Sequence, residues 1–126
     1  MIVVDTSALM AVLLAEPTAA VCMDILSKNA VTLSAGTLAE ALIVASQRGF
    51  ADEIRSLLTI VQAEIVPVDN SFANLMAEAY ARFGKGNHPA GLNYGDCFAY
   101  TLCRMKGWPL LFVGDDFART DVIRAI

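Results

Sequence analysis

The sequence predicts a three-layer α/β domain in which helices flank a mostly parallel central sheet of four to five strands. Short runs of apolar, mostly β-branched residues alternate along the chain with longer segments whose apolar residues recur at helical spacing. Strands that alternate with helices in this way form crossover units, which place consecutive strands parallel. Because the 126 residues contain no internal repeat and no linker-like stretch, we expect a single domain over residues 1–126.

The elements are predicted in chain order from these patterns. Ile2–Val4 is expected to be a buried strand, because its three apolar side chains would face both sides of the sheet. Further strands are predicted at 30–34, 64–68 and 108–113, and Pro67 places the third at a sheet edge or a strand end. Apolar spacing and capping residues predict helices at 7–14, 18–28, 36–48, 52–63, 71–83 and 94–106. Residues 84–93, rich in helix breakers, form the longest expected loop.

Composition limits the class of protein. Hydrophobic residues make up 56% of the chain, so we expect some apolar surface to be buried against a partner or a second copy. No apolar run approaches the ~18 residues of a membrane span and no basic signal region opens the chain, which favours a cytoplasmic protein without membrane contact. The three cysteines form no C-x-x-C pair, so reduced, buried thiols are expected.

The net charge of −4 constrains any role with nucleic acid. Proteins that bind nucleic acid through charge alone are normally basic. If this chain acts on phosphates, bound cations or a local basic patch must offset its carboxylates. Two pairs at i,i+4 spacing, Asp24–Lys28 and Glu78–Arg82, are expected to neutralise each other on exposed helix faces.

Three carboxylates stand alone in apolar segments. Asp5 is the only charged side chain before residue 16, Glu40 the only one between residues 30 and 47, and Asp96 the only one between residues 89 and 102. Each has a local explanation: Asp5 can cap the following helix, Glu40 can point into water, and Asp96 can form a helix cap with Asn93. Taken one at a time, these alternatives stay open.

A fourth acidic position, Asp115-Asp116, follows the last predicted strand. In a parallel sheet this pair and Asp5 share the carboxyl edge, and the helices that carry Glu40 and Asp96 begin near it. The four positions can therefore converge. Apposed carboxylates repel, and Mg²⁺ or Mn²⁺ relieves that repulsion through oxygen ligands. One or two such ions can activate water and stabilise the leaving oxygen of a phosphodiester, whereas a chain with one histidine has no His-based acid/base pair.

In this order and spacing the residues resemble the PIN domain family, specifically the VapC-type ribonuclease toxins of type II toxin–antitoxin pairs. The resemblance covers essentially the whole chain. It rests on the apolar lead into Asp5-Thr-Ser-Ala-Leu, on Glu40, on Gly-Leu-Asn-Tyr-Gly-Asp96-Cys, and on Pro-Leu-Leu-Phe-Val-Gly-Asp-Asp-Phe followed by Thr120-Asp121. It implies an RNase H-like sheet and a Mg²⁺-dependent endoribonuclease, with Mn²⁺ able to substitute, that acts on tRNA or other structured RNA.

The resemblance also implies residue roles. Asp5 and Asp96 match the family's metal ligands, and Glu40 matches a third acid that helps to hold metal or orients the attacking water. The fourth acid is Asp115 or Asp116, which the sequence does not separate, although Asp116 keeps the Asp-Phe pairing common in this subgroup. The expected catalytic set is thus Asp5, Glu40, Asp96 and Asp115 or Asp116, with Asp116 as the fourth metal ligand. The side chains expected to support this set through hydrogen bonds are Thr6, Ser7 and Asn93, and Asn93 can equally cap its helix or reach phosphate.

Partners follow from the same resemblance. It implies a homodimer and a small VapB-like antitoxin whose tail covers an apolar groove and blocks the acidic site, with no direct, specific DNA binding by this chain. Helices 18–28 and 52–63 are candidates for that groove, or plain core elements. The candidate RNA-binding cations are Lys85, His88, Arg82 and Arg48. His88 is not expected to bind metal, since Mg²⁺ prefers oxygen.

Competing families fit less well. A haloacid-dehalogenase phosphatase needs a second acid two residues after the first, where this chain has Ser7. A response-regulator receiver needs adjacent acids after the first strand and a lysine after a late strand, and neither is present. The remaining alternative is a PIN fold that binds RNA or a protein without cutting. The filled acidic positions argue against a decayed site but do not prove turnover.

Overall fold

The centre of the fold is a sheet of four parallel strands. The computed structural model describes residues 1–126 and orders the strands β3-β2-β1-β4. In the central strands Val3 pairs with Thr32 on one side and with Leu110 on the other. The predicted parallel sheet is confirmed, with its strands at β1 Ile2–Val4, β2 Val31–Ser34, β3 Glu64–Val66 and β4 Leu110–Leu111.

Six helices connect and cover the strands, as predicted. Their ends lie within three residues of the expected ones. Ser34 begins α3 by accepting the backbone N–H of Thr37, and Asp69 begins α5 by accepting that of Phe72. None of the helices combines the length and apolar character needed to cross a membrane. The helices are α1 Thr6–Leu13, α2 Ala19–Lys28, α3 Ala35–Gln47, α4 Ala51–Ile60, α5 Asn70–Phe83 and α6 Tyr94–Lys106.

Two strands are shorter than predicted by two residues or more. β3 stops at Val66, directly before Pro67, and lies at a sheet edge as that proline indicated. β4 contains only Leu110 and Leu111 of the predicted 108–113, because only these two residues pair with β1. On its other side Leu110 forms a single bridge to Arg124, so the C-terminal tail covers part of that edge.

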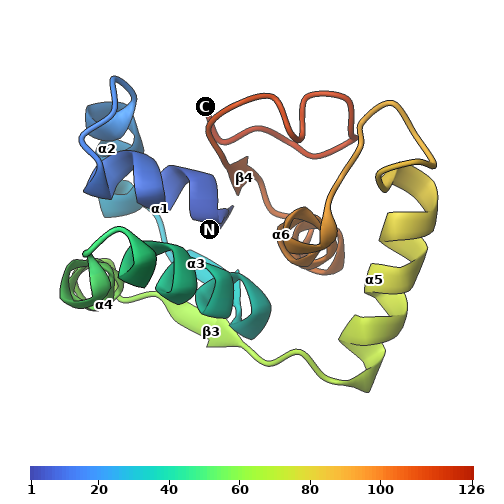
Figure 1. The fold of residues 1–126 in the computed structure, drawn as a ribbon, viewed down its shortest axis with the longest axis horizontal. Helices are drawn as coiled ribbons and strands as arrows, with labels where there is room; N and C mark the ends of the chain where they lie inside the picture. Colours follow the sequence, from blue (N-terminus) through green and yellow to red (C-terminus); the bar gives the residue numbers. More distant parts are fainter.

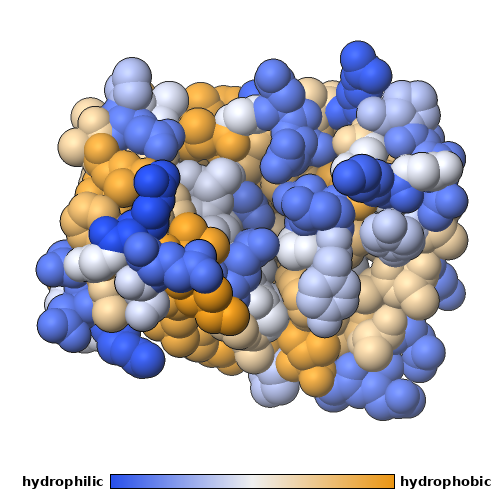
Figure 2. All heavy atoms as spheres, in the orientation of Figure 1, coloured by the Kyte–Doolittle hydropathy of each residue, from blue (hydrophilic) through white to orange (hydrophobic).

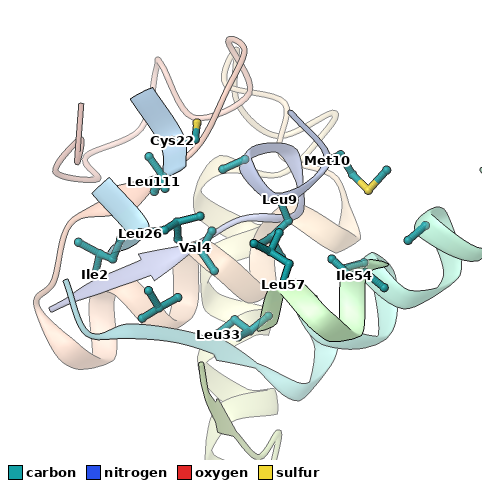
Figure 3. Packing of buried hydrophobic residues seen from close by; sticks show 14 residues of the cluster. Ile2, Val4, Leu9, Met10, Cys22, Leu26, Leu33, Ile54, Leu57 and Leu111 are labelled. Atoms are coloured by element: carbon teal, nitrogen blue, oxygen red, sulfur yellow. The ribbon is translucent and has the colours of Figure 1, made fainter. Parts of the chain in front are cut away.

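Side-chain alternation along β1 divides the interior into two cores. Ile2 and Val4 face a core built with α1 to α4, and Figure 3 shows Val4 near Leu9 of α1 and Leu57 of α4, and Ile2 near Leu26 of α2. Val3 faces the second core, built with α5 and α6. The helices therefore form two layers, with α1 to α4 at the left of Figure 1 and α5 and α6 at the centre and right. The three-layer prediction is confirmed.

The helices proposed for a docking groove contribute to the first core. Cys22 and Leu26 of α2 and Ile54 and Leu57 of α4 are buried, so the inner faces of both helices are core. All three cysteines are free and buried, as expected from their spacing.

Candidate active site

Asp5 lies where β1 ends and α1 begins. Its backbone N–H donates to the carbonyl of Leu111, which continues the pairing of β1 with β4, at 3.0 Å. Its Oδ2 accepts the backbone N–H of Ser7 at 3.0 Å and so caps α1. Burial raises the pKa of Asp5, the charge of Glu40 raises it further, and the hydrogen bonds from Ser7 oppose both effects. Asp5 is therefore a helix cap and also a buried acid at the carboxyl edge of the sheet.

Glu40 is held by residues of the two neighbouring helices. The hydroxyl of Thr6 on α1 donates to Oε1 of Glu40 on α3 at 2.6 Å. On the α6 side Gly95 packs so closely on the Glu40 carboxylate that a Cβ there would overlap a carboxylate oxygen. Glu40 is half-buried and does not simply extend into water. The hydrogen bond predicted for Thr6 is thus present, and it positions Glu40 at the junction of α1, α3 and α6.

Asp96 forms the predicted capping box with Asn93. Its backbone N–H donates to the Asn93 side chain at 2.8 Å, and its Oδ2 accepts the Asn93 backbone N–H at 3.0 Å. Burial raises the pKa of Asp96 to about 6; the charges of Asp116, Asp5 and Glu40 add to the rise, and the Asn93 hydrogen bond opposes it. Four acids from four segments therefore act on one another, and Asn93 braces Asp96 as well as capping α6.

The structure separates Asp115 from Asp116. The charge of Asp116 contributes to the raised pKa of Asp96, whereas that of Asp115 does not. Asp116 precedes Phe117, which is buried against Phe112 with ring centroids 5.2 Å apart. Upstream, the Ser7 hydroxyl accepts the backbone N–H of Val113 at 3.0 Å and joins this segment to α1. These two attachments hold the segment that carries both exposed aspartates beside α1, and the assignment of Asp116 as the fourth acid stays a prediction.

The donor chemistry of this acidic cluster (Asp5, Glu40, Asp96 and Asp116) suits a hard divalent cation. All side-chain donors are carboxylate oxygens, and none of the three ion pairs in the structure involves them. No three His, Cys, Asp or Glu side chains are gathered closely enough to enclose an ion by themselves. Mg²⁺ commonly binds one or two carboxylates and keeps several waters. The donor type of the cluster therefore suits Mg²⁺ or Mn²⁺, and binding of either ion stays a prediction.

Arg82 does not form the local pair expected for it. Its Nη1 lies 3.5 Å from Oδ2 of Asp121, and no ion pair joins it to Glu78. Its guanidinium also lies over the ring of Phe83, 4.8 Å from the centroid. The prediction of a Glu78–Arg82 pair was wrong because a carboxylate from the C-terminal tail, distant in sequence, reaches the arginine. The Asp24–Lys28 pair is present, at 2.9 Å.

The other candidate cations lie outside the acidic cluster. His88 is fixed within its loop, where Nδ1 accepts the backbone N–H of Ala90 and the ring packs edge-on against Phe83. Lys85 is exposed in the same loop, and Arg48 is exposed at the C-terminal end of α3, two turns beyond Glu40. None of them forms an ion pair with the acids. Their RNA-binding role stays a prediction.

Sequence reasoning assigned no role to Asp121, which organises a second polar cluster. Its Oδ1 accepts the hydroxyl of Tyr100 at 2.8 Å, and Oδ2 lies 3.3 Å from Nη1 of Arg104, besides Arg82. Burial and this hydrogen bond raise the pKa of Tyr100 to about 12. Asp121 is the only acid after Asp116, a signal that could have marked it. Its partners are distant in sequence and leave no local pattern.

Comparison with known proteins identifies a consistent group of relatives. The family model described as PIN domain matches residues 2–123. A "Ribonuclease VapC" of Mycolicibacterium smegmatis is 42% identical and covers 95% of this chain and 96% of its own. "Ribonuclease VapC30" of Mycobacterium tuberculosis is 40% identical, with 95% of each chain covered.

Solved structures share the fold at low sequence identity. Mycobacterium tuberculosis VapC20, described as a sarcin–ricin loop cleaving toxin, superimposes with a TM-score of 0.78 at 15% identity and covers 99% of this chain and 98% of its own. VapBC2 from Rickettsia felis, bound to a DNA fragment from its promoter, gives 0.71 at 17% identity, with 98% and 96% covered. A toxin–antitoxin complex from Klebsiella pneumoniae gives 0.72 at 16% identity, with 96% and 93% covered.

Proposed function

Because the chain belongs to the PIN domain family, in its VapC ribonuclease branch, we propose that it is an endoribonuclease that hydrolyses RNA phosphodiester bonds. One observation carries the proposal beyond kinship: burial and the charges of Asp5, Glu40 and Asp116 together raise the pKa of Asp96. Crowded carboxylates without a basic partner are characteristic of sites that act through a bound cation.

The acids have distinct tasks in this proposal. Asp5 and Asp96 would hold a Mg²⁺ or Mn²⁺ ion with the help of Glu40 and Asp116, and such an ion would supply an activated water and stabilisation of the leaving oxygen. Thr6 holds one oxygen of Glu40, so the carboxylate is fixed before substrate arrives. Asn93 fixes Asp96 through two hydrogen bonds. Glu40 is the group best placed to orient the attacking water, because the Thr6 bond uses only Oε1.

Structured RNA is the proposed substrate class, tRNA included. The description of VapC20 as a sarcin–ricin loop cleaving toxin supports a folded RNA target. Recognition of folded RNA depends on shape and on contacts to phosphates and 2′-hydroxyls. A comparison of cleavage of hairpin and unstructured RNAs of equal length tests this part of the proposal.

A VapB-like antitoxin is the proposed inhibitor, as two of the similar structures are toxin–antitoxin assemblies. An apolar groove of about 610 Å³ runs between α3 and α6, and Glu40 lies in its wall. It continues toward α5 through Val68, Tyr94 and Phe98. Figure 2 shows hydrophobic residues gathered over α3 and below α6. We propose that an antitoxin tail binds in this groove rather than on α2 and α4. A tail in the groove would reach the acidic cluster, because Glu40 lies in the groove wall.

A homodimer is proposed to bury part of the remaining apolar surface. Large exposed side chains on several elements are candidates for such an interface, among them Val21 on α2, Ile60 on α4 and Ile123 in the tail. Light scattering of the purified chain measures its mass in solution, and a monomer at micromolar concentration contradicts this proposal.

The central test compares RNA cleavage by wild type, Asp5→Asn and Asp96→Asn with Mg²⁺ or Mn²⁺. Asparagine also caps helices well, so both variants keep the hydrogen bonds that begin α1 and α6. We expect each to lower kcat at least about 100-fold. Asp24→Asn, an exposed acid paired with Lys28 on α2, is the control and keeps wild-type cleavage. Equal cleavage by all four proteins ends the metal-nuclease proposal.

The second candidate is a PIN fold that binds RNA or a protein without cutting it. It is favoured by one observation, namely that no three potential ligands enclose a common point. Calorimetric titration with Mn²⁺ separates the two functions. Stoichiometric binding that Asp96→Asn abolishes supports the nuclease, whereas RNA binding without Mn²⁺ uptake supports the silent module.

A further inference from the structure

Positive charge in this acidic chain is concentrated toward its C-terminus. Residues 79–126 contain six basic and four acidic residues, a net charge of +2, whereas residues 1–78 contain three basic and nine acidic residues, a net charge of −6. The two values give the chain's total of −4. The six basic residues are Arg82, Lys85, Arg104, Lys106, Arg119 and Arg124.

This division is spatial as well as sequential. The six residues belong to the end of α5, the loop after it, α6 and the C-terminal tail. In Figure 1 α5 lies at the right, α6 at the centre, and the tail runs along the top of the molecule until its end approaches α1 and α2. A polyanion approaching the acidic cluster is therefore repelled less on the α5–α6 side than on the opposite side.

Arg82 and Arg104 stand at the centre of this side. They line a pocket of about 370 Å³ between α5 and α6, together with Leu75, Glu78, Tyr100 and Thr101. Their side chains are 60% and 57% exposed, yet both are held by Asp121. A guanidinium carries five N–H donors, and each ion pair here is made through Nη1 alone. Arg82, Arg104 and Asp121 together have a net charge of +1, and Glu78 brings that of the pocket as a whole to zero. The phosphate ligands offered here are therefore the guanidinium N–H donors that the ion pairs leave directed to solvent.

We propose that Arg82 and Arg104 form a phosphate-binding subsite for the backbone of the RNA substrate. The inference rests on the proposed nuclease function and adds the direction in which RNA leaves the acidic cluster. Arg104 follows Asp96 by eight residues on the same helix, about 12 Å along its axis. The strand therefore runs from the cluster along α6 toward the tail. Two guanidiniums that Asp121 holds in advance lose less freedom on binding phosphate than two mobile side chains.

The proposed subsite distinguishes the basic residues expected to contact RNA from those that are not. Arg82 acts with Arg104, which the sequence did not single out, and Lys85 lies three residues beyond Arg82 on the same side. Arg48, at the end of α3, and Arg55, on α4, belong to the negative part of the chain, and on this proposal they do not contact the substrate. Phosphate contacts of this kind position the RNA but do not read its sequence.

The test measures binding of a fluorescent RNA hairpin by anisotropy over a range of salt concentrations, without divalent ions so that nothing is cleaved. We expect Arg82→Gln and Arg104→Gln each to weaken binding about 5- to 10-fold and to lower the slope of log K against log salt by about 0.7–0.9. The double variant lowers the slope by about twice as much. Arg55→Gln, an exposed arginine on α4, is the matched control with unchanged affinity and slope.

Asp121→Asn distinguishes phosphate binding from a structural effect of the broken ion pairs. It breaks the same pairs but leaves both guanidiniums and removes a competing negative charge. We expect it to bind RNA at least as tightly as wild type. If it weakens binding as much as Arg104→Gln does, or if the arginine variants keep the wild-type slope, the subsite is overturned.

Cleavage assays separate this inference from the nuclease proposal. With Mg²⁺ present, the arginine variants are expected to raise KM and to leave kcat within about threefold of wild type. Loss of kcat with unchanged KM contradicts the subsite and leaves the nuclease standing. A wild type that binds the hairpin but never cuts it contradicts the nuclease, while the salt slopes still decide the subsite.

Discussion

Asp96 and Asp121 are both attached to α6, yet their surroundings are opposite. Asp96 lies among three other carboxylates with no basic side chain paired to any of them. Asp121 receives a tyrosine hydroxyl and two guanidiniums, and Tyr100, the donor, follows Asp96 by one helical turn. Asp121 is stabilised by basic partners within the chain, whereas Asp96 has only the hydrogen bond from the Asn93 backbone. On the proposed function, a bound cation supplies the positive charge that Asp96 lacks.

The largest expected effect on kcat distinguishes an acid of the acidic cluster from an acid directly beside it. Asp116→Asn should lower kcat at least about 100-fold, because Asp116 is one of the charges acting on Asp96. Asp115→Asn, its direct neighbour in the chain, should stay within about threefold of wild type. Rates measured at saturating Mg²⁺ and RNA make the comparison, and a reversed order assigns the fourth acid to Asp115.

The next largest effects are expected when one hydroxyl is removed beside the acidic cluster and one beside Asp121. Thr6→Val deletes the bond to Glu40 and should lower kcat about 10-fold with RNA affinity unchanged. Tyr100→Phe deletes the bond to Asp121 and should lower the unfolding free energy by about 1 kcal/mol. Urea unfolding and single-turnover cleavage of both variants measure the two outcomes. Thr59→Val on α4, whose hydroxyl bonds to its own helix, is the control.

Stability without metal should change in opposite directions at the two sites. Asp96→Asn removes a buried charge and its repulsion, and should raise the unfolding free energy near neutral pH by about 1–3 kcal/mol. Asp121→Asn removes two partly exposed ion pairs and should lower it by about 1 kcal/mol. Urea titration in excess chelator measures both. A lower unfolding free energy for Asp96→Asn than for wild type would show that repulsion between the carboxylates does not destabilise the fold.

The smallest effect is the pH dependence of stabilisation by Mg²⁺. With the pKa of Asp96 raised from 3.8 to about 6, the folded chain holds more protons than the unfolded chain between these values. Stability of the metal-free protein therefore falls as pH rises through that window. Mg²⁺ requires the charged form, so its stabilising effect should grow as pH rises through about 6, by a few degrees in Tm. Thermal melts with and without Mg²⁺ test this, and an equal shift at low and high pH contradicts it.

Local sequence patterns predicted most of the fold and the convergence of Asp5, Glu40 and Asp116 on Asp96. Three apolar residues before Asp5 predicted β1, and the isolation of Glu40 and Asp96 in apolar helices marked both acids. Features that depend on contacts between distant segments were not predictable in this way. The i,i+4 rule paired Arg82 with Glu78, but Asp121 reaches it from the tail. Apolar character predicted a strand over 108–113, whereas pairing with the short β1 limits β4 to two residues.

The division of the interior into two cores has a consequence for how the protein could be taken apart. The segment between β3 and α5, which includes exposed Pro67 and Val68, joins the first core to the helices of the second. A chain opened there would leave Asp5 and Glu40 on one fragment and Asp96 and Asp116 on the other. Neither fragment alone would contain all four acids. Cleavage of RNA by the mixed fragments would then report their reassembly into a split enzyme, with the position of the chain break set by the boundary between the two cores.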